Sequence, residues 1–588
     1  MYKQNTVSGK RRGSFQNTGT EGADLYARLP NSSTRCKIKG REYPRTTSRP
    51  GKELIMATME APPRLQIRLH EGAFKNETFV DFAKEENVRK MHAALEKVRG
   101  QLGREYDLIV GGKRIKTSGK IRSINPAKPS EVVGVHQKAD LEHVEPAVNA
   151  ALQAFTHWSR TSAEERASLL FRVGDVMRER KLEYMAWLVF EVSKNWFEAD
   201  ADISEAIDFC EFYAREALRF AKVEPPVQLP GERDTLAYIP LGVGAVIPPW
   251  NFACAIMAGM TLASIVSGNT VVLKPSSDSP TIAAKFVELL EECGMPEGVV
   301  NFCPGGGVSF GDALVSHPKV RYISFTGSRE VGLHINHSAA QQQPGQIWIK
   351  RTILEMGGKD ATVVDADADI DSAVEGVAAA AFGFQGQKCS ACSRAIVDER
   401  VYDKFLEKLK SRVERITVGD PTANPNMAAV INEGSMKDIL RYIEIGKKDG
   451  RLITGGARDA KASSEGGYFI QPTVIADIPE KSTLEQEEIF GPVLVVIKSR
   501  NFDHALEIAN DTEFGLTGAV YSSSREKLDR AVREFHVGNL YLNRKCTGAM
   551  VGAHPFGGFN MSGTDSKSGG PDYLYLFTQA KSVGEKIA

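Results

Sequence analysis

The chain has 588 residues, of which 42% are hydrophobic and 25% are charged, as is typical of a globular enzyme and not of a disordered or fibrous chain. Lys plus Arg and Asp plus Glu both number 74, so no net charge draws the chain to nucleic acid or to a membrane. Eight cysteines are too few for a disulfide scaffold, and the longest apolar stretch, residues 255–266, is shorter than the ~18 residues of a membrane span. We therefore expect a reducing compartment, the cytoplasm, with no nucleic-acid partner and no membrane partner.

Residues 1–62 are expected to be a disordered basic leader. Residues 1–52 carry twelve Lys or Arg and three Asp or Glu, and they lack the apolar periodicity that a packed element needs. Three interpretations remain open: an upstream leader that precedes a natural start at Met56 or Met59, an organellar transit peptide, and a nucleic-acid-binding arm. We favour the first.

Helical patterns follow the leader. Apolar residues recur three and four apart in residues 88–102, which predicts one packing helix. Residues 147–222 are typical of long helices that are interrupted near residues 193–196. From residue 241 onward, short apolar strands alternate with helices. The strands are predicted at 244–247, 270–273, 299–302 and 321–325, and the helices at 251–266, 281–293 and 312–315.

This alternation predicts an α/β fold with doubly wound parallel sheets. Ligands bind at the carboxyl edge of such a sheet, so the candidate segments are those that follow the strands: 249–251, 274–276, 305–307 and 327–328. No G-x-G-x-x-G follows these strands, and Leu333 stands where a phosphate loop needs Lys. A Gly-Ser turn before a helix can still hold a diphosphate. Lys274 could reach a ribose or a phosphate, or could be a solvated lysine.

Cys389 is the candidate nucleophile. It lies in the polar, glycine-bearing segment GQKCSAC (386–392), and we expect the adjacent Lys388 to favour the thiolate. Cys392 completes a C-x-x-C, for which metal binding lacks a second ligand pair and dithiol chemistry stays a minor alternative. Glu355 lies in an apolar segment that runs into glycines, where we expect a partly desolvated carboxyl that is either the base or a structural hydrogen-bonding group. Asn251 is the candidate oxyanion donor. We predict no metal site.

Seven motifs in order carry a resemblance. They are PWNF (249–252), VLKP (272–275), FTGS (325–328), LEMGGK (354–359), GQKCS (386–390), EIFGP (488–492) and PFGG (555–558). Together they resemble the aldehyde dehydrogenase superfamily from about residue 65 to the end. The segments 382–391, 543–552 and 562–574 resemble the monofunctional bacterial branch that oxidises glutamate γ-semialdehyde to glutamate in proline degradation.

The resemblance implies a role for each matching residue. Cys389 would form a thiohemiacetal and then a thioester, Asn251 would hold the oxyanion, and Glu355 would activate water. The implied NAD-binding residues are Trp250, Lys274, Ser277, Gly307, Gly311, Phe325, Gly327, Ser328, Glu488 and Phe490. The implied substrate-binding residues are Phe252, Lys388, Ser390, Gly548, Ala549 and Phe556, with the two phenylalanines sandwiching the methylene groups.

Two departures from the family pattern affect function. Ser277 stands where the family often has a Glu that excludes NADP, so we expect NAD to be the cofactor and NADP to be accepted as well. Cys392 puts a second thiol near the nucleophile. We expect it either to pack in the core, which we favour, or to form a disulfide with Cys389.

The resemblance also implies a division of the chain. We expect an NAD(P)-binding domain at 63–353 with an oligomerisation hairpin near 223–240, a catalytic domain at 354–541, and a substrate anchor loop with an oligomerisation tail at 542–588. The partners would be the small-molecule substrate and further copies of the chain, as a dimer or higher homo-oligomer. The open alternatives are a dehydrogenase for another semialdehyde, such as succinic semialdehyde, and a DNA-binding regulator acting through the basic leader.

Overall fold

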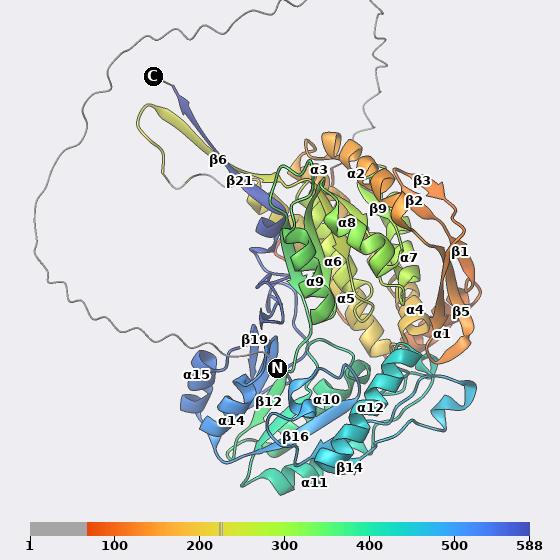
Figure 1. Ribbon diagram of the computed structural model, residues 1–588, viewed down its shortest axis with the longest axis vertical. Coiled ribbons are helices and arrows are strands. Elements are labelled where there is room, and N and C mark those ends of the chain that lie inside the picture. Colours follow the sequence, from red (N-terminus) through yellow and green to blue (C-terminus); the bar gives the residue numbers. More distant parts are fainter. Residues whose placement is uncertain (1–66, 223–224, 226, 588) are drawn as a thin grey trace, which may run out of the picture. The chain divides into compact units, whose positions relative to one another are not determined.

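The computed structural model describes residues 67–222, 225 and 227–587, and Figure 1 shows the path of the chain through these residues. The predicted basic leader, 1–62, lies outside the described residues. Within them, no helix is both long enough and apolar enough to cross a membrane.

A seven-stranded sheet forms around the strands that the sequence predicts. Its order is β11-β10-β7-β8-β9-β2-β3. The strands are β11 (Arg351–Glu355), β10 (Val320–Thr326), β7 (Val243–Ile247), β8 (Thr270–Leu273), β9 (Val300–Phe302), β2 (Leu108–Val110) and β3 (Lys113–Ile115). The first five are parallel, and the β2–β3 hairpin adds an antiparallel edge. The four predicted strands are confirmed, whereas β11 and the hairpin were not predicted.

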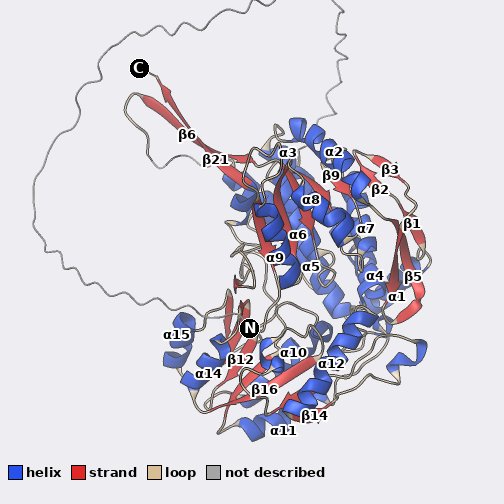
Figure 2. Cartoon of the chain, viewed as in Figure 1, coloured by secondary structure: helices blue, strands red, loops and turns tan. Residues whose placement is uncertain are grey.

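Both faces of this sheet are buried. Along β7, Ala245 and Ile247 pack into one cluster with α2 (Val144–Trp158), α8 (Asp312–Ser316) and α9 (Arg329–Ala340). Val246 points to the other side and joins a cluster that includes α6 (Ala255–Val266) and α7 (Pro280–Glu292). Helices therefore flank the strands, as Figure 2 shows. This explains the continuous apolar strand sequences, because a parallel sheet is covered on both sides.

Three long helices precede the sheet, and local backbone conformation and capping set the boundary between the second and the third. They are α3 (Ala163–Glu179), α4 (Lys181–Val192) and α5 (Trp196–Phe220). Ser193 adopts a left-handed conformation with φ of 56°, which ends α4 and confirms the predicted interruption. The Asn195 side chain then accepts a hydrogen bond from the Glu198 backbone N–H and caps α5. Farther upstream, α1 (Glu85–Arg99) buries the predicted apolar face.

The predicted helix at 251–266 begins later than expected, at Ala255. The Asp202 carboxylate on α5 accepts a hydrogen bond of 2.6 Å from the Ala255 N–H, which fixes the first turn there. Residues 251–254 consequently form a turn outside the helix, and this leaves Asn251 free to reach another segment.

A second seven-stranded sheet has the order β14-β15-β16-β13-β12-β18-β19. The strands are β14 (Arg451–Thr454), β15 (Thr473–Ala476), β16 (Val493–Ser499), β13 (Arg394–Asp398), β12 (Ala361–Val364), β18 (Thr517–Tyr521) and β19 (Asn539–Leu542). All are parallel except β14. Helices α10 (Ile370–Phe382) and α11 (Tyr402–Val413) cover one face, and α12 (Glu433–Asp449), α14 (Phe502–Asn510) and α15 (Arg525–Glu534) cover the other.

The two sheets confirm the α/β fold class with doubly wound parallel sheets. The predicted division between residues 353 and 354 falls inside β11, which pairs with β10 along its whole length. Three more strands, β1 (Arg104–Tyr106), β4 (Lys120–Asn125) and β5 (Lys128–Gln137), form a separate small sheet that was not predicted.

The predicted oligomerisation flap combines a hairpin near 223–240 with the C-terminal tail. The described part of the hairpin contributes one strand, β6 (Glu232–Pro240), whose antiparallel partner is β21 (Thr578–Lys586). The register runs from the pair Pro240–Thr578 to the pair Glu232–Lys586, so the two strands form a long two-stranded ribbon, visible in Figure 1. The pairing of β6 with the C-terminal tail agrees with the expected flap, whose role in oligomerisation stays a prediction.

Candidate active site

The Cys389 segment leaves the end of α10 through a turn of unusual backbone geometry. Phe384, Gln385 and Gly386 all have positive φ, at 49°, 57° and 66°. The Gln385 side chain holds this turn, since its amide donates to the Ala429 carbonyl at 2.8 Å and its oxygen accepts from the Ala428 N–H at 3.0 Å. The turn is buried, and such backbone strain is common where a segment must present a functional group.

Asn251 reaches this segment from the first sheet. Its side-chain amide donates a hydrogen bond of 3.2 Å to the Gln387 carbonyl, two residues before Cys389, and the side chain is buried. The loop after β7 and the turn after α10 are therefore joined at the nucleophile. This agrees with an amide donor beside the reacting carbonyl, the role predicted for Asn251.

Lys388, whose charge we expect to act on Cys389, pairs with another group. Its ammonium lies 2.6 Å from the Glu198 carboxylate of α5. Burial raises the pKa of the Cys389 thiol well above its usual range, and the neighbouring carboxyl groups add to the effect. The expected effect of Lys388 on the thiolate stays a prediction.

Glu355 ends β11 at the edge of the first sheet. The Ser566 hydroxyl donates to one carboxyl oxygen, and the Gly558 N–H donates to the other at 3.4 Å. Burial raises the pKa of Glu355 to about 8, although both hydrogen bonds oppose the rise. The predicted partly desolvated carboxyl is therefore found. Ser566 lies in the quoted segment 562–574, but nothing in its pattern singled it out.

Glu355 and Cys389 line one small cavity of about 50 Å³. This cavity shares several lining residues, including Cys389, with a larger cavity of about 270 Å³. All six predicted substrate-binding residues line the larger cavity: Phe252, Lys388, Ser390, Gly548, Ala549 and Phe556. The fold thus brings together, around one thiol, residues that are up to three hundred positions apart in the chain.

The larger cavity also has residues that the sequence analysis missed. Glu198, Glu205 and Asp208 line it from α5, Lys545 from the loop after β19, and Phe79 from the segment before α1. The acidic residues of α5 could have been found from their spacing. They are four, three and three positions apart and so share one helix face: Glu198, Asp202, Glu205 and Asp208.

Glu205 differs from its neighbours in having no hydrogen-bond partner among the described residues. Burial, reinforced by Asp202 and Asp208, raises its pKa to about 8. Glu205 lines both cavities together with Cys389. The larger cavity thus holds three acidic residues and two lysines, of which Lys388 is paired with Glu198.

The predicted cofactor residues lie at the carboxyl ends of the first-sheet strands and on one loop of the second sheet. Lys274 follows β8 and lies beside Gly311, where a Cβ would meet its side chain at 3.5 Å. Burial lowers the pKa of Lys274, and within the described chain its ammonium donates one hydrogen bond, to the Pro275 carbonyl at 3.5 Å. A buried ammonium with so weak a partner fits a ribose hydroxyl or a phosphate.

Three further contacts join predicted cofactor residues to one another or to the loop after β11. The Glu488 carboxylate accepts a hydrogen bond of 3.0 Å from the Gly358 N–H. The rings of Trp250 and Phe490 lie edge to face, 5.6 Å apart. A Cβ at Gly327 would meet the Phe325 ring at 2.5 Å.

The structure connects three of the predicted cofactor residues less directly to the others: Ser277, Gly307 and Ser328. Ser277 is exposed, and Gly307 begins the turn that ends at Gly311. The Ser328 hydroxyl caps α9 by accepting from the Val331 N–H. Within the described chain, none of the three makes a hydrogen bond to another predicted cofactor residue.

Comparison with known proteins decides the family. The family profile described as "Aldehyde dehydrogenase family" matches residues 114–583. The chain belongs to the aldehyde dehydrogenase family.

Curated relatives of this aldehyde dehydrogenase include 1-pyrroline-5-carboxylate dehydrogenase from Geobacillus thermodenitrificans, 56% identical over 87% of this chain and 99% of the relative. Another is 1-pyrroline-5-carboxylate dehydrogenase 2 from Bacillus subtilis, 55% identical with the same coverage. Among solved structures, 1-pyrroline-5-carboxylate dehydrogenase from Thermus with bound NAD has a TM-score of 0.86 and 50% identity, covering 88% of this chain and all of that one.

Cys392 packs in the core of the second sheet. Its side chain is buried, and its thiol donates to the Thr362 hydroxyl at 3.2 Å. Cys546 belongs to the same buried cluster. These contacts favour the packing interpretation over the disulfide with Cys389.

Proposed function

We propose that this aldehyde dehydrogenase oxidises L-glutamate γ-semialdehyde, the open form of 1-pyrroline-5-carboxylate, to L-glutamate with NAD. The observation that carries the proposal is the cavity of about 270 Å³ that Cys389 lines together with the six residues predicted to hold the substrate. The names of the relatives at 55–56% identity support the same substrate.

The reaction would begin at Cys389, whose sulfur attacks the aldehyde carbon once its proton has left. Asn251 and the Cys389 backbone N–H would hold the oxygen of the resulting thiohemiacetal, because both donors belong to the joined loops described above. NAD, when bound, would supply the hydride acceptor for this oxidation. Cys389 would then hold the acyl group as a thioester, and Glu355 would remove a proton from the water that hydrolyses it.

The substrate is a zwitterion, and the cavity offers groups for both of its charges. Lys388, Ser390 and the backbone of Gly548 and Ala549 would bind the α-carboxylate. The rings of Phe252 and Phe556 would enclose the methylene groups. Succinic semialdehyde has no ammonium group, so the carboxyl groups of the cavity would favour glutamate semialdehyde over it.

We assign NAD to the first sheet. In this proposal Lys274 binds the adenosine ribose, Ser328 the diphosphate and Glu488 the nicotinamide ribose, with Phe490 close to the nicotinamide ring. The first sheet and its helices would then form the cofactor domain, and the second sheet would form the catalytic domain.

Two further proposals concern the oligomeric state of the enzyme and its cellular compartment. The β6–β21 ribbon leaves strand edges unpaired and exposes apolar side chains such as Ile239 and Val583, which supports a homo-oligomer. All seven cysteines of the described chain are free thiols, which agrees with a reducing compartment such as the cytoplasm.

Steady-state kinetics with 1-pyrroline-5-carboxylate and NAD tests the function. We expect kcat/KM for this substrate to exceed that for succinic semialdehyde by at least tenfold, the effect of about 1.4 kcal/mol. Cys389→Ala should abolish turnover and leave NAD binding unchanged. Cys293→Ala, which removes a buried thiol at the end of α7, should turn over normally. A preference for succinic semialdehyde, or turnover by Cys389→Ala, would contradict the proposal.

A further inference from the structure

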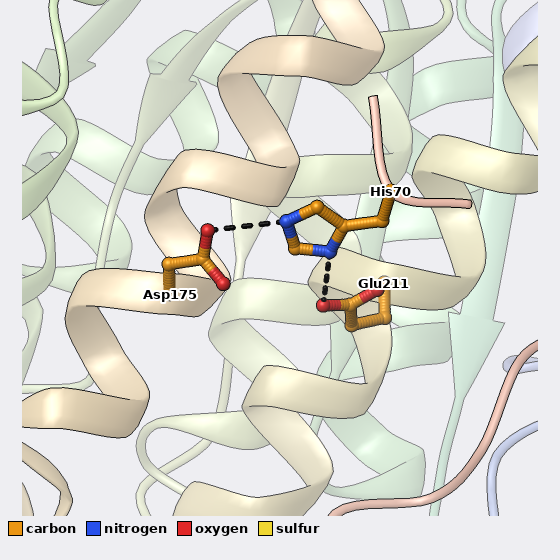
Figure 3. Close-up of side chains that lie close together, drawn as sticks. All are labelled: His70, Asp175 and Glu211. Atoms are coloured by element: carbon orange, nitrogen blue, oxygen red, sulfur yellow. Dashed lines mark hydrogen bonds and ion pairs between the residues drawn. The ribbon is translucent and has the colours of Figure 1, made fainter. Parts of the chain in front are cut away.

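The N-terminal arm, residues 67–84, precedes α1 without helix or strand and lies outside residues 114–583, which the family profile matches. It is fastened at its beginning. The ring of His70 contacts the Glu211 carboxylate of α5 through Nδ1 at 2.9 Å and the Asp175 carboxylate of α3 through Nε2 at 3.1 Å, as Figure 3 shows. The ring also stacks on Phe171, with 4.4 Å between the centroids.

Hydrogen bonds connect the members of the His70 cluster. The two ring nitrogens contact different carboxylates, one on α3 and one on α5, as Figure 3 shows. Arg178 also pairs with Asp175 at 3.0 Å and with Glu211 at 3.3 Å. The cluster, which we call the clasp, therefore attaches the beginning of the arm to α3 and α5.

Beyond the clasp, the arm contacts the substrate cavity. The Asn76 side-chain amide donates to the Asp208 carboxylate at 2.8 Å and to the Val551 carbonyl at 3.0 Å. The Glu77 N–H donates to the other oxygen of Asp208 at 2.6 Å. Asp208 lines the cavity from α5, and Val551 ends the anchor loop, residues 547–551, every residue of which also lines it.

Aromatic side chains of the arm reinforce this connection. The Phe74 ring lies edge to face on Phe212 of α5, with 5.3 Å between centroids. A Cβ added at Gly552, directly after the anchor loop, would touch both rings at 3.2 Å. Phe79 lines the cavity itself. The arm is thus packed against one end of the anchor loop and against one wall of the cavity.

We propose that Asn76 is a positioning residue for substrate binding: its single amide fixes the anchor loop at Val551 to the cavity wall at Asp208. The inference rests on the proposed function, because Gly548 and Ala549 of that loop would bind the α-carboxylate of the substrate. Asn76 does not line the cavity, so it acts through the loop and not on the reacting atoms. Its removal should weaken binding of the amino-acid end and spare the chemistry at Cys389.

Kinetics with two aldehydes tests this role. Asn76→Ala should raise KM for 1-pyrroline-5-carboxylate by about 5- to 30-fold, the effect expected for two lost hydrogen bonds. kcat/KM for propionaldehyde, which lacks the amino-acid end, and the Kd of NAD should change less than twofold. Asn76→Asp keeps the size of the side chain but loses both donors, so its KM should rise at least as much.

Asn87→Ala is the matched control, because Asn87 makes a comparable bond of 2.9 Å to the Asp81 carbonyl and contacts no part of the anchor loop. Its KM should equal that of the wild type. Hydrogen exchange supplies a readout that does not depend on turnover: the amides of residues 547–551 should exchange faster in Asn76→Ala, and those of α10 should not.

An equal loss with both aldehydes, an unchanged KM in Asn76→Asp, or unchanged exchange in the anchor loop would overturn the role of Asn76. These outcomes are separate from the proposed function, which fails only if the wild type does not prefer 1-pyrroline-5-carboxylate.

Discussion

The ionisation of Glu355 sets the pH range in which the active site can accept a proton from water. Burial raises the pKa of Glu355 to about 8, and burial raises the pKa of the Cys389 thiol as well. The form of Glu355 able to accept a proton from water therefore grows as the pH rises towards 8. The pH dependence of the second half-reaction should therefore report on Glu355.

Thioester hydrolysis in the wild type should accelerate with pH up to an apparent pKa of about 8. Glu355→Gln should keep the initial burst of NADH but slow the steady state by ~10²–10⁴-fold, the usual contribution of a general base. The residual steady-state rate of Glu355→Gln should not depend on pH with this apparent pKa. Ser566→Ala removes a hydroxyl that stabilises the carboxylate, so its profile should move to higher pH. Stopped-flow and steady-state measurements between pH 6 and 9.5 decide this, and a burst lost together with the steady state would assign Glu355 an earlier role.

Ser277 concerns the choice of nucleotide. It is exposed and carries no charge, so no fixed carboxylate at this position would repel a 2′-phosphate. NADP should support turnover at a modest disadvantage to NAD. Ser277→Glu should increase discrimination against NADP by ~1–3 kcal/mol, and Ser277→Gln, which adds length without charge, should change it little. The ratio of kcat/KM for the two nucleotides measures this. Complete rejection of NADP by the wild type would show that another group excludes it.

At the scale of structural elements, the turn 383–386 connects α10 to the nucleophile and is the strained part of the site. Three consecutive positive φ values occur there, and Gly386 is the only glycine among the three residues. A Cβ at Gly386 would collide with the Gly491 carbonyl of the loop that carries Glu488 and Phe490. The turn thus needs glycine both for its backbone conformation and for its close approach to the predicted cofactor loop.

Gly386→Ala should lower the free energy of unfolding by at least ~1–2 kcal/mol, the cost of a left-handed non-glycine residue, and by more because of the collision. Activity should fall as well, since the turn presents Cys389. Gly466→Ala is the matched control: Gly466 also has a positive φ, of 89°, but no atom lies within 4 Å of its added Cβ. That variant should lose stability by the backbone cost alone and keep its kcat. Denaturant unfolding and kinetics of both variants decide the point, and equal effects would refute the role of the collision.

At the scale of the whole molecule, two sheets bring their loops to one site and a ribbon extends the chain. The first sheet supplies Asn251, Lys274 and Glu355 at its carboxyl edge, and the second supplies Glu488 from the loop that precedes β16. The β6–β21 ribbon joins residues more than three hundred positions apart, and a two-stranded ribbon is marginally stable by itself. A second copy of the chain would cover its unpaired edges.

Light scattering tests the homo-oligomer. The full chain should have at least twice the chain mass of 64.3 kDa. Removal of residues 579–588, which deletes most of β21, should shift the mass towards that of a single chain. Val583→Glu on the ribbon should weaken association, whereas Val532→Glu, at a comparably exposed site on α15, should not. A full chain of 64.3 kDa would refute the proposal.

The sequence by itself predicted the elements whose signals are local. Four strands of the first sheet, the interruption near Ser193 and the nucleophile segment could be predicted because apolar periodicity, glycine and proline act within a few residues. Seven ordered motifs then indicated the family, and the predicted substrate residues do line one cavity with Cys389. The start of α6 was predicted too early, because the Asp202 carboxylate that fixes it is remote in sequence.

Only the tertiary structure decided the features that depend on distant neighbours. It paired Lys388 with Glu198, which lies 190 positions away, since a charge acts on whatever lies nearest in space and not in sequence. It paired β6 with β21, placed Cys392 in the core, and brought Asn76 to the anchor loop. In each case the deciding contact joins residues far apart along the chain, and local patterns carry no information about which distant groups folding brings together.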